Sequence, residues 1–441
     1  MSYQKLLLFF LIFFCPVGVH AYGPRSVSAT GKIVKWELPV RLDIESDLSV
    51  RDKDVSALLD AGLKMWSDVS EASLTYSKQD LGVAVDADNV CCYLYDGSAC
   101  PNGPLTDGKN PIVIDDDGAV VAKFFGTSNR YTTLGFAAVI SHDKDTGKAV
   151  KGEAVFNAAC LSGVALSDCG GLSFSDDDFT SFIVHEIGHF LGLNHAQVNL
   201  DEADDTDTSN DDKITTMHPF FTPGNGANFK TPEKDDKVGL AFLYPASNFS
   251  SSTFTISGTI HDTNGTTEFA CANVIARNAD TSKSRVDAVS FVSGQMCADG
   301  DFDKSCDGNY EIHGLDPAAS YLVTVEKINK DIKSASGIPP CEGTGFQPGF
   351  TTQTRSSSIT STAGTEASGV DFTLSGTTGN VNSLILSPLD ISEEDGSDDS
   401  LFEEAVLAIE AKSVSDSCST TSTVDSGGSS NSSGGCTLFP R

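Results

Sequence analysis

The stretch His185-Glu186-Ile187-Gly188-His189-Phe190-Leu191-Gly192-Leu193-Asn194-His195 contains three imidazoles and one carboxylate at fixed spacing. Apolar residues recur before and within it at helical spacing, and Ser175 with Asp178 forms the sequence pattern of a capping box. The sequence therefore predicts a helix that begins after Ser175 and carries His185 and His189 one turn apart on one face.

The predicted end of this helix accounts for the third histidine. Gly192 can adopt a left-handed backbone conformation that residues with a Cβ resist, so the chain can turn there and bring His195 back. Three neutral imidazoles, His185, His189 and His195, would then bind zinc and leave a fourth position open for water. Glu186 lies beside the first ligand but outside the ligand set. The sequence thus predicts a catalytic zinc site with Glu186 as its general base.

The full pattern, HExxHxxGxxH, resembles that of the metzincin metalloproteases, in which a methionine-containing turn follows the zinc ligands. Thr215-Thr216-Met217-His218-Pro219 is the candidate turn, and the resemblance implies that Met217 packs beneath the zinc without binding it. Residues 235–245 are similar to the closing helix of the matrixin family, and Lys35-Trp36 is similar to its opening strand. The resemblance to a matrixin covers about residues 30–246.

The same resemblance makes Glu153–Asn157 the edge strand beside the substrate, where an extended peptide could pair by strand addition. Two features depart from the matrixin pattern. An acidic segment, residues 201–212, separates the zinc ligands from the turn, and His218 stands where matrixins often have tyrosine and astacins have histidine. A different metzincin subgroup is therefore an alternative to a matrixin. In that case, residues after Met217 would supply a fifth ligand. No cysteine is found between residue 21 and residue 90 to act as a latency switch.

The N-terminus is typical of an exported protein. Lys5, the apolar run Leu6–Phe14 and the small-residue pattern Val19-His20-Ala21 predict a signal peptide over residues 1–21, too short to span a membrane stably. Export permits disulfides, and eleven of the twelve cysteines remain once Cys15 is removed with the signal peptide. Clustering along the chain predicts three local pairs: Cys160–Cys169, Cys297–Cys306 and Cys418–Cys436. Cys91, Cys92 and Cys100 leave one cysteine over, and the sequence does not show which of the three it is.

A formal net charge of −32 excludes a general nucleic-acid or anionic-membrane binder, because phosphates would be repelled. Acidic residues cluster in three loops, Asp205–Asp211, Asp115–Gly118 and Asp299–Asp303, where alternating carboxylates could hold a structural calcium ion. None of the three has the complete EF-hand pattern. A solvated acidic loop is the alternative for each of them.

The chain divides by composition into a signal peptide and three further units. Residues 22–246 form the expected zinc-protease domain, an α+β fold with a twisted mixed sheet and an active-site helix. Residues 247–253 are expected to be a linker, and residues 254–375 resemble a carboxypeptidase-regulatory-type β-sandwich. Residues 376–441 have the composition of a disordered acidic tail. We expect the first domain to fold alone, because a domain of its length can bury a sufficient core.

Together these features predict a secreted, zinc-dependent endopeptidase that acts on proteins or peptides, with no nucleic-acid partner and no membrane span in the mature chain. The tail could associate the protein with a cell surface. The alternative is a catalytically inactive binding or adhesion protein on a metzincin scaffold. Intact His185, Glu186, His189 and His195 favour the enzyme.

Overall fold

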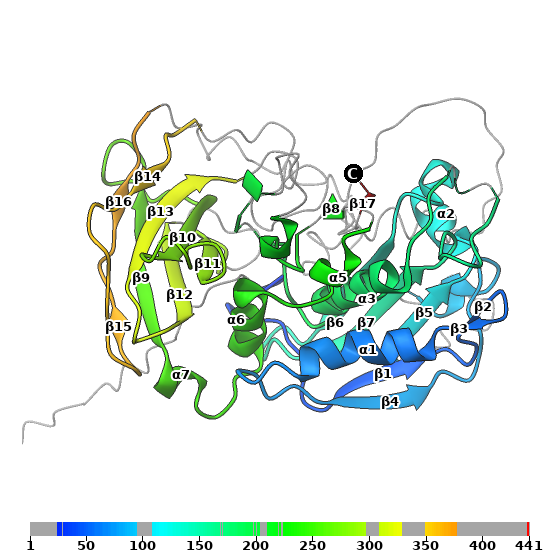
Figure 1. The fold of residues 1–441 in the computed structure, drawn as a ribbon. Helices are drawn as coiled ribbons and strands as arrows, with labels where there is room; N and C mark the ends of the chain where they lie inside the picture. The colour runs from blue at the N-terminus through cyan, green and yellow to red at the C-terminus, as the bar shows by residue number, and fades with distance from the viewer. Residues whose placement is uncertain are drawn as a thin grey trace, which may run out of the picture.

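The computed structural model describes residues 24–94, 108–296, 308–328, 349–376 and 439–440, apart from residues 29, 168, 170, 197, 200, 203–209, 219, 222 and 223 within them. The fold is α+β, and it consists of two lobes with helix α6 (Lys234–Leu243) between them (Figure 1). We call residues 24–246 the N-terminal lobe and residues 254–376 the C-terminal lobe.

A five-stranded mixed sheet forms the centre of the N-terminal lobe, in the order β4-β1-β5-β7-β6. Its strands are β1 (Val40–Ile44), β4 (Tyr76–Asp80), β5 (Pro111–Asp115), β6 (Gly135–His142) and β7 (Ala149–Asn157). All neighbours pair in parallel except β6 and β7, which are antiparallel. The prediction of a mixed sheet in an α+β fold is confirmed.

Helices cover both faces of this sheet. Helices α1 (Ser56–Ser67) and α3 (Asp176–Phe190) lie over one face (Figure 1). Alternate strand residues such as Val155 point to the opposite face and join a separate apolar cluster with α2 (Ala119–Phe125). Helix α3 therefore packs against both the sheet and the neighbouring α1, and its apolar side chains are buried there.

The identity of the edge strand differs from the sequence prediction. β7, which contains Glu153–Asn157, is paired on both sides, and the strand at the end of the sheet is β6. Every residue of β7 from Gly152 to Asn157 is buried, as expected for a strand with neighbours on both edges. The prediction that Glu153–Asn157 forms the edge strand is therefore wrong, because β6 is the strand at the edge of the sheet.

The start of the sheet is also later than the resemblance implies. Lys35 makes only an isolated bridge with Lys148, and the first strand begins at Val40. Trp36 stacks on Phe190 of α3, with ring centroids 5.1 Å apart. This segment therefore packs against α3 and lies outside the central sheet.

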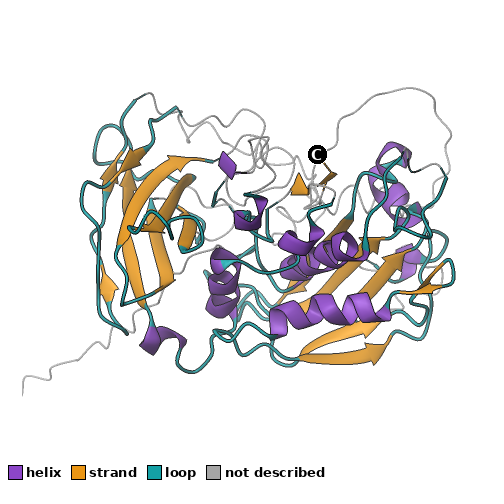
Figure 2. Ribbon diagram, in the orientation of Figure 1, coloured by secondary structure: helices purple, strands orange, loops and turns teal. Residues whose placement is uncertain are grey.

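The C-terminal lobe consists mainly of strands (Figure 2). They form two further sheets, in the orders β11-β10-β13-β14 and β12-β9-β15, with β16 also paired to β9. Their strands are β9 (Phe254–His261), β10 (Ala272–Asn278), β11 (Ala288–Val292), β12 (Asn309–Leu315), β13 (Tyr321–Lys327), β14 (Gln353–Thr354), β15 (Glu366–Ala367) and β16 (Phe372–Thr373). Side chains from both sheets, including Ile256 and Val323, form one buried core.

The two lobes share this second core. Val238 and Ala241 of α6 are fully buried in it, although α6 belongs by sequence to the N-terminal lobe. The expected linker, residues 247–253, contains the short helix α7 (Phe249–Ser252), and Phe249 is buried in the same core. The serine-rich composition suggested an open connection, but one phenylalanine fixes this segment to the C-terminal lobe.

Shorter elements complete the described chain. They are β2 (Ser49–Val50), β3 (Lys53–Asp54), β8 (Phe220–Phe221), α5 (Gly226–Phe229) and β17 (Phe439–Pro440), with single 3₁₀ turns at Val90–Cys92, Thr127–Asn129 and Asp211–Lys213. β17 pairs in parallel with β8, so the end of the chain returns to the N-terminal lobe. Residues 377–438, most of the predicted tail, lie outside the described residues.

Among the predicted disulfides, Cys160–Cys169 is confirmed. The predicted pairs Cys297–Cys306 and Cys418–Cys436 lie outside the described residues. Cys91 and Cys92 are both disulfide-bonded, as is Cys271. Within the described part of the chain, no helix is long and apolar enough to cross a membrane.

Candidate metal centre

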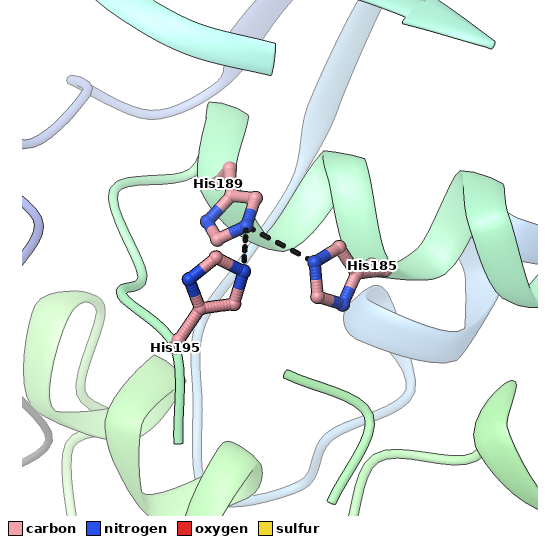
Figure 3. Close-up of side chains that lie close together, drawn as sticks. All are labelled: His185, His189 and His195. Atoms are coloured by element: carbon pink, nitrogen blue, oxygen red, sulfur yellow. Dashed lines mark hydrogen bonds between the residues drawn. The ribbon is translucent and has the colours of Figure 1, made fainter. Parts of the chain in front are cut away.

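The three predicted ligands converge in the structure. His189 Nε2 lies 3.1 Å from His185 Nε2 and 3.1 Å from His195 Nε2 (Figure 3). Two nitrogens bound to one tetrahedral zinc would stand about 3.3 Å apart, given Zn–N bonds of about 2.0–2.1 Å. Among the described residues this is the only group of three histidine, cysteine or acidic side chains whose ligand atoms come this close. The site could hold a metal ion such as zinc.

The other ring nitrogens fix the orientation of two ligands. His185 Nδ1 lies 2.8 Å from the carbonyl oxygen of Thr216, and His189 Nδ1 lies 2.9 Å from that of Leu193. A carbonyl can only accept, so each Nδ1 donates and each Nε2 lone pair faces the centre. Burial lowers the pKa of His185 to about 4 and the pKa of His189 well below its usual value. Both rings are therefore neutral at pH 7, the form that binds metal.

Local sequence signals place the helix and the turn. The capping box is present, with Asp178 N–H donating to Ser175 Oγ and Ser175 N–H donating to the Asp178 carboxylate. Gly192 follows the last turn of the helix with a φ of +99°, the left-handed conformation predicted for it. His195 is thereby brought back to the face that carries His185 and His189.

The methionine turn lies beneath the centre. Met217 is buried, and a Cβ built on Gly188 of α3 would lie 2.3 Å from its sulfur, so the side chain is in direct contact with the helix. The buried carboxylate of Asp236 accepts hydrogen bonds from the backbone N–H groups of Thr216 and Met217, at 2.9 and 3.1 Å. Asp236 was not among the predicted site residues. The sequence feature that could have indicated it is the acidic pair Asp235-Asp236 at the start of the closing helix.

We expect Gly188→Ala to destabilise the fold without changing the ligand set. The added methyl group would overlap Met217 and approach Trp66 to 3.0 Å, and overpacking of this kind costs about 1–3 kcal/mol. Thermal melting of the metal-free protein would measure the loss. Ala57→Ser is the control, because it also adds one heavy atom to a helix but does so at an exposed position of α1. An equal or smaller loss at Gly188 would contradict the tight packing of Met217.

Glu186 is fully buried, with 0% of its surface exposed. A Cβ built on Gly135 of β6 would lie 2.7 Å from Glu186 Cγ, so the carboxylate side chain packs directly against the start of the edge strand. The predicted base thus lies on the helix that carries His185 and His189 and packs against the edge strand. A substrate can reach it only if part of the surrounding chain moves.

The C-terminal lobe borders the metal centre. A small pocket beside His195 is lined by Met217 and Asp235 from one lobe and by Ser290 and Gln295 from the other. Asp235 is buried and accepts hydrogen bonds from the backbone N–H and the hydroxyl of Ser290, at 2.6 and 3.2 Å. Burial raises the pKa of Asp235 to about 8, so the carboxyl is largely protonated at neutral pH. Sequence reasoning did not identify this contact, because its two residues are 55 positions apart.

The remaining site predictions concern His218 and the three candidate calcium loops. His218 is buried but does not join the group of three ligands. Asp115–Gly118, a predicted calcium loop, forms no group of three acidic ligands among the described residues. The other two predicted calcium loops lie wholly or mostly outside the described residues. Calcium binding stays a prediction.

Comparison with known proteins gives little further information. No protein-family model matches the chain, and no curated protein matches it. Among solved structures, the chain is similar to metalloproteinase-II from Bacteroides fragilis, with 12% sequence identity and a TM-score of 0.23. The similarity covers 52% of this chain and 58% of the other. Identity and TM-score are both too low for this similarity to bear on the activity of the chain.

Proposed function

We propose that this protein is a zinc-dependent endopeptidase of the metzincin type, similar to matrixins, that hydrolyses peptide bonds in proteins. The observation that carries the proposal is the convergence of three buried histidines around one point, with Glu186 on the same helix as two of them and beside the edge strand. The donor set of three imidazoles suits zinc and leaves one position for a water molecule or substrate.

The proposed chemistry divides between the ion and the chain. Zinc held by His185, His189 and His195 would polarise the scissile carbonyl and make a water molecule acidic. Glu186 then accepts a proton from that water and later delivers it to the leaving amine. The outward edge of β6 positions the substrate backbone by strand pairing. Enclosure of the site excludes bulk water and so strengthens these electrostatic interactions.

One observation favours a second candidate, an inactive binding or adhesion protein on the same scaffold. Glu186 has no exposed surface in the structure, and a catalytic base must meet both water and substrate. Incubation of the zinc-loaded chain with a peptide library, with and without a chelator, separates the two candidates. Chelator-sensitive cleavage supports the enzyme, whereas intact peptides support the binding protein.

Replacing His185, His189 or His195 by alanine is expected to abolish stoichiometric zinc binding, because each variant leaves two of the three protein ligands. Zinc content of the purified proteins, measured by elemental analysis, is the readout. His218→Ala is the matched control, since this buried histidine follows Met217 in the methionine turn but lies outside the ligand group. Equal zinc loss in His218→Ala would place His218 among the ligands and favour a different metzincin subgroup.

We further propose that the protein is exported, with residues 1–21 removed as a signal peptide, and that the C-terminal lobe is an accessory β-sandwich of the carboxypeptidase-regulatory type. Two four-stranded sheets around one core support the second part. Association with a cell surface through residues 376–441 is part of the same proposal. Mass spectrometry of the N-terminus of the secreted protein would test export.

A further inference from the structure

The N-terminal segment, residues 24–28, reaches the metal centre. Pro24 forms a bridge with Leu193, and the backbone N–H of Arg25 donates to the carbonyl of Gly192 at 2.8 Å. Leu193 is the residue whose carbonyl orients His189. The segment is therefore paired with the same turn that positions the metal ligands.

Arg25 is buried in this site. Among the described residues it is the only lysine or arginine that is buried, with 6% of its surface exposed. Burial of a guanidinium group costs several kcal/mol unless polar partners compensate it. One partner is the carbonyl oxygen of Ala137, which accepts a hydrogen bond from Arg25 Nη1 at 2.8 Å. Its positive charge is one cause, after burial, that lowers the pKa of His185 and His189, so it lies within electrostatic reach of both ligands.

Ala137 presents its carbonyl at the outward edge of β6. Asn157 N–H donates to the Leu134 carbonyl, and antiparallel pairs alternate between bonded and non-bonded types. By that alternation Ala137 and Ala154 form a non-bonded pair, so the Ala137 carbonyl points away from β7. No described strand pairs with this edge of β6. Arg25 therefore occupies an acceptor at the edge where the proposed substrate would bind. A carbonyl oxygen has two lone pairs, so it can accept from a side chain there as well as from a backbone N–H.

This acceptor is close to the proposed base. Gly135, which packs against Glu186, precedes Ala137 by two residues, or about 7 Å along a strand. A backbone carbonyl selects side chains that donate hydrogen bonds, and arginine and lysine carry five and three such N–H groups with no acceptor. The net charge of −32 also attracts basic peptides.

We propose that the outward edge of β6 at Ala137 is a subsite for an arginine or lysine side chain of the substrate, and that Arg25 fills it in cis. The N-terminal segment then acts as a pseudosubstrate and keeps the chain latent until it is displaced or cut away. In this proposal the structure is the closed state of the site, which explains why Glu186 is fully buried. This inference rests on the proposed peptidase function and adds its substrate class and regulation.

The first test compares Arg25→Ala with Lys32→Ala in the full-length, zinc-loaded protein. Lys32 is exposed and lies in the same N-terminal region, so it is the matched control. A tethered segment has an effective concentration of about 1 mM, so its loss should raise kcat/KM for an arginine-containing peptide at least about tenfold. Lys32→Ala should stay within about twofold of the wild type. If Arg25→Ala does not fold, Arg25→Gln, which removes the charge and keeps most of the length, takes its place.

A synthetic peptide with the sequence of residues 22–28 should inhibit the Arg25→Ala protein. The same peptide with alanine in place of its arginine should be a weaker inhibitor by about tenfold or more, because only the arginine reaches the subsite. Equal inhibition by the two peptides, or unchanged activity in Arg25→Ala, would overturn the subsite.

A readout independent of hydrolysis separates this inference from the proposed function. The rate at which a chelator removes zinc reports closure of the site, and it should rise at least about fivefold in Arg25→Ala but not in Lys32→Ala. Faster zinc release with no hydrolysis in any variant would contradict the peptidase while supporting closure by Arg25. If all variants hydrolyse the peptide with equal kcat/KM and release zinc at equal rates, closure by Arg25 is contradicted and the peptidase function is not.

Discussion

Glu186→Gln is expected to reduce peptide hydrolysis by about 10²-fold to 10⁴-fold while zinc content and thermal stability stay unchanged. An amide cannot accept the proton that the proposed mechanism assigns to the carboxylate, and general acid–base catalysis contributes this much to a typical rate. The change corresponds to about 3–5 kcal/mol in the activation barrier. The substitution preserves the size of a side chain that is fully enclosed between α3 and β6, so packing is retained.

Initial rates on one peptide, with zinc measured in the same samples, check this result. Arg25→Ala is the suitable background if the wild type is latent, because the base is then accessible in the parent protein. Glu37→Gln is the matched control, since its side chain is exposed and remote in sequence from the zinc-binding string. Retention of more than about a tenth of the parent activity by Glu186→Gln would show that another group accepts the proton.

Removal of residues 254–441 is expected to unfold or aggregate the N-terminal lobe, in contrast to the expectation from sequence that this lobe folds alone. The deletion would expose Val238, Phe242 and Phe249, which now pack against the C-terminal lobe. Burial of each such side chain contributes about 1.5–3 kcal/mol, so the sum is comparable with a typical total stability of about 5–15 kcal/mol. The buried carboxyl of Asp235 would also lose Ser290.

Thermal melting of residues 22–253, beside the full mature chain, measures this effect, and a fall in Tm of at least about 10 °C is expected. A chain ending at residue 378 is the control, because it keeps both lobes and their shared core. Its Tm should lie within a few degrees of the full chain. A cooperative melt of the shorter fragment at the same temperature as the full chain would show that the lobes are independent after all.

The local features of the site were predictable because local sequence encodes them. Histidines four residues apart share a helix face, a capping box joins residues three apart, and a glycine permits the left-handed turn that returns His195. The spacing of apolar residues also predicted helix α3. These interactions lie within one turn or one strand, so no knowledge of distant partners was needed.

Sheet order and lobe contacts needed the tertiary structure. The family resemblance made β7 the edge strand, and the pattern of residues could not correct this. Hydrophobic alternation shows which face of a strand is buried and does not show which neighbour it pairs with. Asp235 and Asp236 appeared only as helix-start acids, because their partners Ser290 and Met217 lie far away in sequence. Arg25, too, was not predicted as a site residue.

The sequence by itself therefore determined the chemistry of this protein, three imidazoles and one carboxylate on a helix and its turn. Only the tertiary structure decided which other parts of the chain lie beside these groups and limit access to them. The N-terminal segment lies at the edge of β6 and the C-terminal lobe packs against α6, through contacts between residues 112 and 55 positions apart, respectively. Such contacts depend on how complete surfaces fit together, and no local pattern of residues encodes that fit.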